Sequence, residues 1–495
     1  MLTTFKKQIL PLSLAISTAV LAGCGGGGGS DKDNAPLVTG ATSPVVEENT
    51  TLVSTYNATD ADGDAITLSL TGASSSLFTI TQAGELSFLT APDFENGDTG
   101  PFAVTIVATD DSKKRLTGEL AVEVSVGDVK DTPSFAVVQT VAPDYSGSEV
   151  VTIDPATEIV TKGYYIKDGS DYTVRSYNKD VFHIGRFFID TISKYNADAL
   201  DTAIWTNTTQ DSGDSTSRNP YDIVSVNETK AYILRYGSSK VWIVNPQATT
   251  AEDFKIGELN LDAYIADNNS NGTPNPSAGT IVDGKLFITL QRLSDAYSPN
   301  TAYVAVFDTE TDLEIETNAN ADDAVMGIPL AGLNPLNGSI VNKDGVVYVT
   351  TRNSYTDTDL TLSRIEAITA SDYSLRTVLT ADDIVDNTAA FIGSSVIVSA
   401  TQGYFVAGET FYSPYRELST VYSFNPTTGV VADEAIAETG TEQISHINLD
   451  AANYLWISVS NPENPGVDVV NTETNEKELP RFATELNPTA IAFIE

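Results

Sequence analysis

The sequence predicts an all-β protein with two folded domains. Three observations support this prediction. Between residues 36 and 133, short stretches of alternating apolar and polar residues are separated by turn clusters rich in Asp, Gly, Asn and Ser. From residue 134 to 495, a pattern of strands and turns recurs about every 45–55 residues. Strong helical periodicity is absent from both regions, so we expect sheets throughout.

The N-terminal residues have the parts of an export signal. A basic start at Lys6 and Lys7 precedes an apolar stretch over residues 9–21, which is short for a transmembrane helix. The tetrad Leu21-Ala22-Gly23-Cys24 follows. It resembles the lipobox of bacterial lipoproteins, which implies cleavage before Cys24 and lipid attachment to its thiol. The alternative is an ordinary secretory signal, although the chain has no other cysteine.

This resemblance assigns residues 1–23 to a signal peptide and residues 24–35 to a lipidated cysteine with a glycine-rich tether. The tether opens with Gly25–Gly29, which have no side chains to pack. By resemblance to Gram-negative lipoproteins, Gly25 directly after the cysteine implies sorting to the outer membrane. The lipid would be the contact with the membrane, and the sequence leaves open which face of it, including the cell surface, carries the protein.

The charge balance limits the classes of partner. The chain has 67 Asp and Glu against 27 Lys and Arg, a net charge of −40. Such a surface repels phosphate backbones, so we expect no nucleic acid partner. It attracts cations such as calcium. A solvated acidic surface adapted to salty surroundings is the alternative reading. With one cysteine, no disulfide can form within the chain.

Six landmarks follow one another within residues 36–133. They are Val46-Glu47-Glu48-Asn49, Thr59-Asp60-Ala61-Asp62-Gly63-Asp64, Gly84-Glu85-Leu86-Ser87-Phe88, Pro92-Asp93-Phe94-Glu95, Val107-Ala108-Thr109-Asp110 and Val126-Gly127-Asp128-Val129-Lys130-Asp131-Thr132-Pro133. Their order and spacing resemble a cadherin repeat. The resemblance implies a cadherin-like β-sandwich over these residues.

The same resemblance implies calcium as a cofactor. The ligands that it implies at the C-terminal end of the sandwich are Glu48, Asp93, Glu95, Asp128 and Asp131. Three further acids, Asp60, Asp62 and Asp110, match residues that complete the site of a preceding junction. Calcium takes six to eight hard oxygen ligands, which carboxylates from separate loops can supply. Turn and capping roles for these acids are the alternative, and Lys130 stands where the family has Asn.

A repeated unit fills residues 134–495. It consists of an opener such as Asn334-Pro335-Leu336, an aromatic-centred strand such as Val346-Val347-Tyr348-Val349, and a strand that ends in a turn, such as Val304-Ala305-Val306-Phe307-Asp308-Thr309. Strand-and-turn units of this length are typical of propeller blades, so we predict a seven-bladed β-propeller. A final strand that pairs with the first segment would seal the ring. The units resemble those of surface-layer and quinoprotein-like propellers, a group with many functions.

No catalytic motif is recognisable in the propeller region. His183 and His446 lie in different blades, where a hydrogen-bonded strand histidine is more common than a metal ligand or an acid–base group. Several aromatic residues are candidates for one face of the disc, although most should pack between blades. They are Trp205, Trp242, Trp456, Tyr145, Tyr172, Tyr355, Tyr412 and Tyr415.

These features favour a membrane-anchored binding or adhesion lipoprotein. Its cadherin-like domain would bind calcium as a spacer, and the propeller would present a loop-rich face to a protein or glycan partner. The alternative is an extracytoplasmic lyase or hydrolase, which predicts an Asp, Glu, His or Asn cluster and a metal at the channel mouth. A third possibility is a periplasmic scaffold for outer-membrane assembly, which would have the same fold.

Overall fold

The computed structural model describes residues 33–92, 94, 98–127, 133–317, 325–354, 359–384, 390–412, 415–436, 439, 442–461, 463–477 and 479–494. The chain forms two compact units, Met1–Lys130 and Asp131–Glu495. Several predictions concern residues outside the described ranges. These are the signal peptide, Cys24 and most of the tether, the ligands Asp93, Glu95, Asp128 and Asp131, and Tyr355.

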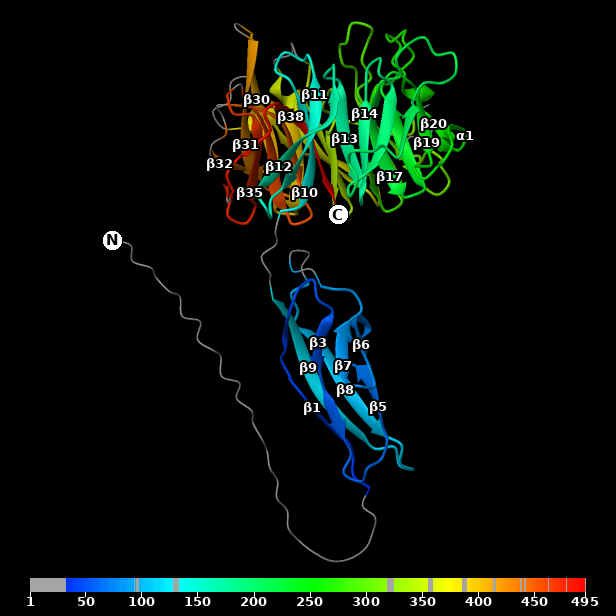
Figure 1. Cartoon of the computed structure of the whole chain (residues 1–495), viewed down its shortest axis with the longest axis vertical. Helices are drawn as coiled ribbons and strands as arrows, with labels where there is room; N and C mark the ends of the chain where they lie inside the picture. The colour runs from blue at the N-terminus through cyan, green and yellow to red at the C-terminus, as the bar shows by residue number, and fades with distance from the viewer. Residues whose placement is uncertain are drawn as a thin grey trace, which may run out of the picture. The chain divides into compact units, whose positions relative to one another are not determined.

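Nine strands make up the described part of unit 1 (Figure 1). They are β1 (Leu37–Thr39), β2 (Val45–Glu47), β3 (Leu52–Thr55), β4 (Asn57–Thr59), β5 (Ile66–Thr71), β6 (Phe78–Ile80), β7 (Glu85–Phe88), β8 (Phe102–Asp110) and β9 (Thr117–Gly127). One sheet has the order β2-β9-β8-β5, a second β3-β7-β6, and a third pairs β1 with β4. Strand β2 runs parallel to β9, and the other pairs are antiparallel.

Alternation along the strands of unit 1 builds one core. On β9, Val122, Val124 and Val126 are buried, whereas the residues between them are more exposed. A strand with this period has one face on the core and one toward water. Side chains from all three sheets meet in the core, which includes Val38, Val46, Leu68, Phe78, Leu86, Phe88, Val104, Ile106, Val122 and Val124.

The described residues of unit 2 form seven antiparallel sheets. The first joins β38 (Asn487–Ile494), β10 (Phe135–Val141), β11 (Ser148–Asp154) and β12 (Ile159–Lys167). The second has β13 (Tyr172–Tyr177), β14 (Asp180–Gly185), β15 (Thr191–Asn196) and β16 (Trp205–Thr208). The third has β17 (Pro220–Asn227), β18 (Lys230–Arg235), β19 (Lys240–Val244) and β20 (Lys255–Asn260).

The remaining sheets follow in chain order. The fourth has β21 (Pro276–Val282), β22 (Lys285–Leu290), β23 (Tyr303–Asp308) and β24 (Ile328–Pro329). The fifth has β25 (Ile340–Lys343), β26 (Val346–Thr351), β27 (Arg364–Thr369) and β28 (Leu375–Thr380). The sixth has β29 (Ala390–Ser399), β30 (Gln402–Tyr412), β31 (Tyr415–Phe424) and β32 (Val431–Ala435). The seventh has β33 (Gln443–Leu449), β34 (Tyr454–Ser460), β35 (Gly466–Asn471), β36 (Glu476–Lys477) and β37 (Phe482–Ala483).

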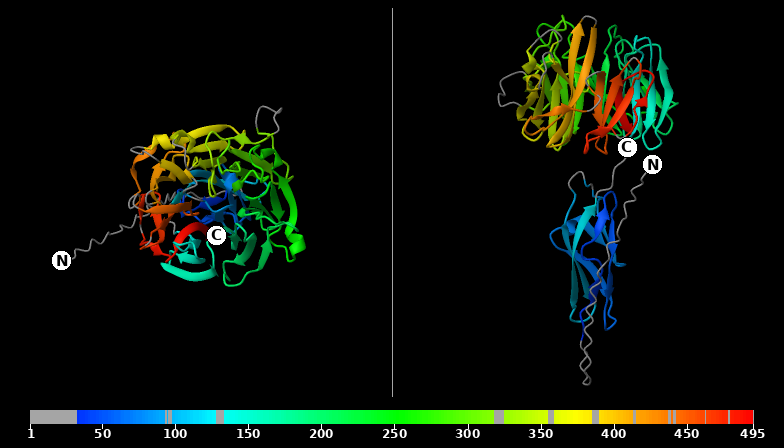
Figure 2. Two further views of the ribbon diagram at one scale, coloured as in Figure 1. Left: turned by 90° about the horizontal axis from the view of Figure 1, so that it is seen from above. Right: turned by 90° about the vertical axis from the view of Figure 1, so that its left-hand side faces the viewer.

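The seven sheets form a closed ring. Contacts join their innermost strands in the order β38, β13, β17, β21, β25, β29, β33 and back to β38. Figure 2 shows the sheets arranged around a central axis. The ring is sealed where β10 pairs with β38, from Phe135 opposite Ile494 to Val141 opposite Asn487. This arrangement is a β-propeller and confirms the predicted repeat.

The repeated sequence motif has a local cause at its turns. The Asp or Asn that ends a third strand accepts hydrogen bonds from backbone N–H groups two or three residues ahead. Asp308 accepts from Glu310 and Thr311, Asn425 from Thr427 and Thr428. Short polar side chains stabilise turns in this way. The apolar runs before these turns are buried on both faces because each sheet packs between two others.

Short helical turns complete the described residues. They are α1 (Ala251–Phe254), η1 (Ser75–Leu77), η2 (Asp262–Tyr264), η3 (Leu360–Leu362) and η4 (Ala381–Asp383). Among the described residues, no helix has the length and apolar character needed to cross a membrane.

Two kinds of link, those within a sheet and those between sheets, lie on the same face of the propeller. Successive strands of a sheet run in opposite directions, so the links from second to third strands emerge on the same face as the links between successive sheets. We call this face the pocket face, because a concavity of the propeller opens among these links.

Candidate functional site

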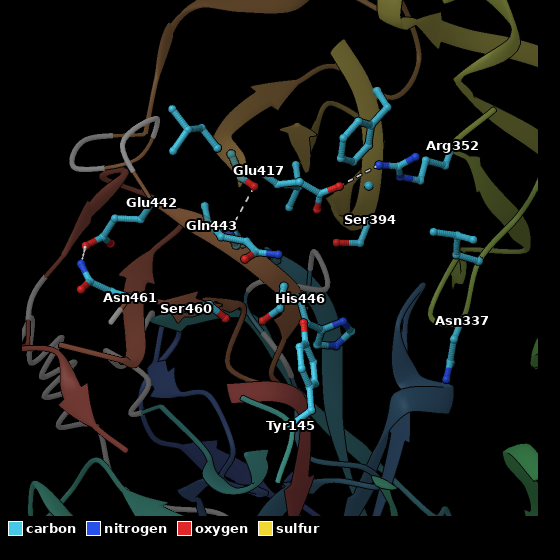
Figure 3. Close-up of a pocket in the computed structure, with 18 residues that line it drawn as sticks. Tyr145, Asn337, Arg352, Ser394, Glu417, Glu442, Gln443, His446, Ser460 and Asn461 are labelled. Carbon is cyan, nitrogen blue, oxygen red and sulfur yellow. Dashed lines mark hydrogen bonds and ion pairs between the residues drawn. The ribbon is translucent and has the colours of Figure 1, made fainter. Parts of the chain in front are cut away.

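The propeller pocket has a cavity volume of about 700 Å³ (Figure 3). This volume lies within the range of about 300–1,000 Å³ that is typical of small-ligand sites. Its lining combines polar and aromatic side chains from four sheets. They include Tyr145, Asn337, Arg352, Phe391, Ser394, Glu417, Ser419, Glu442, Gln443, Ser445, His446, Ser460 and Asn461.

The links on the pocket face position these side chains. Tyr145 lies between β10 and β11, Arg352 directly follows β26, and Asn461 directly follows β34. Each of these is a connection from a second to a third strand. His446 lies on β33, an innermost strand, so it lines the pocket near the axis. The site therefore depends on four sheets holding their places in the ring.

Every acidic side chain of the pocket has a cationic partner. Arg352 contacts Glu417 at 3.0 Å, and its guanidinium lies 3.7 Å from the centroid of the Phe391 ring. Glu442 pairs with Arg481 at 2.9 Å. Arg481 also pairs with Asp468, which has Lys477 at 3.3 Å as a second partner. The hydrogen bonds that Arg481 donates to Asp468 and Glu442 raise its pKa, so the guanidinium stays charged.

His446 adds no positive charge to the pocket. The ring is partly accessible from the pocket but is enclosed by protein on its other sides. This burial, and then the nearby Arg175 guanidinium, lower the pKa of His446 to about 4. The imidazole is therefore neutral at pH 7, with one nitrogen that donates and one that accepts.

His183 has a different environment. It lies within 3.1 Å of the Gln139 side-chain oxygen, stacks on Tyr172 with 4.8 Å between ring centroids, and is buried. Burial lowers its pKa to about 3. These contacts are those of a packing residue between the first two sheets, and they place His183 outside the pocket lining.

Several pocket groups have no hydrogen-bond partner for their side chains among the described residues. They are the hydroxyls of Tyr145, Ser394 and Ser460, the amide of Gln443 and the imidazole of His446. By contrast, Ser445 donates to the Pro488 carbonyl and Ser419 accepts from the Ile444 N–H. The unpartnered groups can therefore bind a ligand without breaking a bond within the protein.

A polar bridge crosses the axis of the propeller. Arg175 on β13 pairs with Asp222 on β17 at 2.6 Å and donates to the Asn337 side-chain oxygen at 2.9 Å. Asn337 precedes β25 of the fifth sheet, which does not adjoin the second. In the described part of unit 2, no three Asp, Glu, His or Cys side chains are close enough to share a metal ion.

Unit 1 contains a group of three carboxylates. Asp33, Asp64 and Asp110 each place an oxygen within 4.8 Å of the others. Asp110 is 1% exposed; its Oδ1 accepts from the N–H groups of Ser112 and Leu116, whereas its Oδ2 is buried without a partner. Burial and the charges of nearby aspartates raise the pKa of Asp64. Carboxylates this close together are candidate ligands for a divalent cation.

Of the three acids predicted to complete the site of a preceding junction, only Asp110 belongs to this group of carboxylates. Asp60 accepts the N–H groups of residues 62–64 with its Oδ1, and its Oδ2 is buried without a partner. Asp62 accepts both the backbone and the side-chain N–H groups of Asn34. Sequence reasoning therefore included Asp110 and the turn from Asp60 to Asp64, but it did not include Asp33. The signal for Asp33 was its position just before the first strand, within the presumed tether.

Glu48 contacts residues that are sequence neighbours of other predicted calcium ligands. It is buried, and its carboxylate accepts the Phe94 N–H at 2.8 Å. Its own N–H donates to the Gly127 carbonyl at 3.1 Å. Phe94 and Gly127 adjoin the predicted ligands Asp93, Glu95 and Asp128, which lie outside the described residues together with Asp131.

Of the five predicted face aromatics whose side chains are described, four pack inside the propeller. Trp456 is buried and donates to Asp450 at 2.9 Å, and Trp205 donates to the Pro246 carbonyl at 3.0 Å. Trp242 is buried against Arg235, and Tyr172 stacks on His183. Only the backbone is described for Tyr412 and Tyr415, which pair with each other across the β30–β31 hairpin. Tyr145, in contrast, reaches the pocket.

Comparisons with known proteins give only distant similarities. No family model matches the chain, and no curated protein does. A putative 6-phosphogluconolactonase from Bacteroides uniformis is 12% identical, with a TM-score of 0.47, over 73% of this chain and 99% of its own. The Dos1 propeller is 11% identical, with a TM-score of 0.40, over 73% and 86%. YCF48 bound to D1 peptide is 7% identical, with a TM-score of 0.39, over 67% and 94%. These similarities say nothing about ligand or activity.

The neutral state of His446 makes stability depend on pH. An unfolded histidine titrates near pH 6.5, whereas folded His446 titrates at about 4. Between these values only the unfolded chain takes up the proton, so the free energy of unfolding decreases as pH falls. Between pH 7 and 5, the free energy of unfolding should fall by about 2 kcal/mol less in the His446→Gln variant than in the wild type. Urea titrations at the two pH values measure this difference. An NMR titration should give the imidazole a pKa near 4, and an unchanged pH dependence in the variant would contradict this account.

Proposed function

We propose that this protein is a membrane-anchored binding lipoprotein whose seven-bladed propeller captures a protein or glycan partner at the pocket face. The observation that supports this most is the cavity of about 700 Å³, where Ser394, Gln443 and Ser460 have hydrogen-bonding groups without described partners. Concave sites with a few convergent polar groups are the usual places for ligands. The acidic net charge of −40 disfavours anionic partners such as nucleic acids.

We further propose that unit 1 is a cadherin-like domain that binds calcium. The buried, unpartnered Oδ2 of Asp110 beside Asp33 and Asp64 supports an ion at that end. Without a cation, three carboxylates so close together repel one another. The contacts of Glu48 with the segments that contain Asp93, Glu95 and Asp128 support a second group of ligands. Bound calcium would stiffen the domain as a spacer between the membrane and the propeller.

The anchor completes the proposal. The tetrad that ends in Cys24 and the glycines that follow it support lipidation of that cysteine and display of the folded units from the outer membrane. Two or three acyl chains on one cysteine give stable anchoring, whereas a single chain is marginal.

Blocking the pocket tests the binding function. Gln443 is exposed at the pocket, so Gln443→Trp should fold normally while it fills the cavity. We expect the variant to lose at least ten-fold in affinity for isolated envelope components, both proteins and polysaccharides, in biolayer interferometry. Val430→Trp is the matched control, because Val430 is 65% exposed and lies between third and fourth strands, away from the pocket face. Equal binding by the two variants would contradict the proposal.

Calcium binding by unit 1 is tested by comparing the stability of the wild type and a variant in chelator and in calcium. Asp110→Asn keeps the Oδ1 acceptor for Ser112 and Leu116 but removes one charge. In a chelator, the variant should melt above the wild type because repulsion is relieved. In millimolar calcium, the wild type should gain about 2–3 kcal/mol of stability if calcium is at about 100 times its Kd. The variant should gain less.

Differential scanning calorimetry of the full chain measures both effects. Glu119→Gln, at an exposed position of β9, is the control and should respond to calcium as the wild type does. Identical melting of the wild type in calcium and in chelator would remove calcium from the proposal.

Removal of the lipid-bearing thiol tests the anchor. Cys24→Ser should abolish labelling with radioactive palmitate and move the protein from the membrane fraction to the soluble fraction of a Gram-negative host, since no thiol remains to be acylated. Ser30→Ala, in the same tether, should leave both properties unchanged. Persistence of Cys24→Ser in a membrane fraction washed with carbonate would overturn the assignment.

A further inference from the structure

The pocket face presents exposed aromatic rings. Tyr145 is 73% exposed, Phe188 69% and Tyr297 79%. They lie in the links β10–β11, β14–β15 and β22–β23, each from a second to a third strand. Phe187 adjoins Phe188 and is 55% exposed. Exposed aromatics on a single face are candidates for a contact surface.

The backbone at these positions is costly for an aromatic residue. The φ angles of Tyr145, Phe188 and Tyr297 are 61°, 61° and 60°. This left-handed region suits Gly or Asn, and a bulky residue there costs of order 1–3 kcal/mol. Tyr145 and Tyr297 end the same kind of turn, in which their N–H groups donate to residues three positions earlier at 2.9 Å. Since the rings bury little within the protein, a contact outside it explains them better than folding does.

Tyr145 joins this aromatic surface to the pocket, because its side chain is both exposed and part of the lining (Figure 3). The lining near it is neutral overall. Arg352 balances Glu417, Arg481 balances Glu442, and His446 is uncharged at pH 7. A charged ligand would therefore find no unpaired opposite charge here, in a chain whose net charge is −40.

The available hydrogen-bonding groups are neutral as well. Gln443 offers two donors and an acceptor, and each hydroxyl of Ser394 and Ser460 offers one donor and two lone pairs. A sugar ring presents hydroxyls at its edge and C–H groups on its face, which match such amides and hydroxyls beside an aromatic ring.

We propose, on the basis of the binding function above, that the pocket takes a neutral oligosaccharide, with one sugar ring stacked on Tyr145 and its hydroxyls bonded to Gln443, Ser394 and Ser460. A peptide is the other macromolecular occupant of the right size. Long-range attraction to this acidic chain would favour basic peptides, and these need unpaired acids in the pocket. Glu417 and Glu442 are both paired, so the neutral ligand fits better.

The experiment uses the full chain in detergent and an array of neutral, sialylated and sulfated oligosaccharides, followed by calorimetry with the neutral oligosaccharide that binds most strongly. We expect neutral oligosaccharides to bind to the wild type, and we expect Tyr145→Ala to lower their affinity at least ten-fold. Tyr145→Phe should lose less, because the stacking ring remains. Tyr297→Ala is the matched control: it removes a similarly exposed ring from the same kind of turn in another sheet, and this ring does not line the pocket, so affinity should not change.

Tyr145→Gly separates binding from folding. Glycine fits a φ of 61° without strain, so this variant should melt no lower than the wild type while it loses oligosaccharide binding. A Tyr145→Gly protein that is stable and binds normally would overturn the inference.

The outcomes distinguish the inference from the binding function. If only charged oligosaccharides or peptides bind, and Gln443→Trp blocks them, the neutral-sugar inference fails while the pocket remains a binding site. If no neutral oligosaccharide binds and Gln443→Trp does not affect envelope binding, both fail.

Discussion

The pairing of β38 with β10 is the constraint on which the candidate site depends. It joins the end of the chain to the beginning of unit 2 and closes the ring of innermost strands. Tyr145 belongs to the sheet that this pairing completes, whereas Glu417 and His446 belong to the sixth and seventh sheets. Glu417 and His446 lie on sheets that pack directly on each other, whereas Tyr145 is held beside them through the sheet that the pairing completes. The closure therefore removes exposed sheet edges and also brings the pocket walls together.

Acidic side chains have different surroundings in the propeller pocket and in unit 1. In the pocket, Arg352 pairs with Glu417 and Arg481 pairs with Glu442, so that the lining is neutral although the chain has 67 acidic residues. In unit 1, Asp64 and Asp110 approach Asp33, whose nearest cationic partner is Lys114, 61% exposed and 3.7 Å away. Paired acids favour a site for neutral ligands, and poorly compensated acids favour a cation.

Local chemistry made much of the fold predictable. Asp308 and Asn425 cap their turns through bonds to neighbouring N–H groups, so the motif is visible in a short window of sequence. The pocket could not be predicted in this way, because its walls come from segments up to about three hundred residues apart that meet only in the closed ring. The carboxylate group of Asp33 was missed for a related reason: the tether and the domain were treated as separate parts.

The bridge from Arg175 to Asp222 and Asn337 has a consequence for the interior of the ring. It joins side chains of the second, third and fifth sheets, of which the fifth does not adjoin the other two. The Asp222 side chain is buried, so loss of Arg175 would leave a carboxylate inside the protein without its cation. The relative positions of these three sheets therefore depend in part on one arginine.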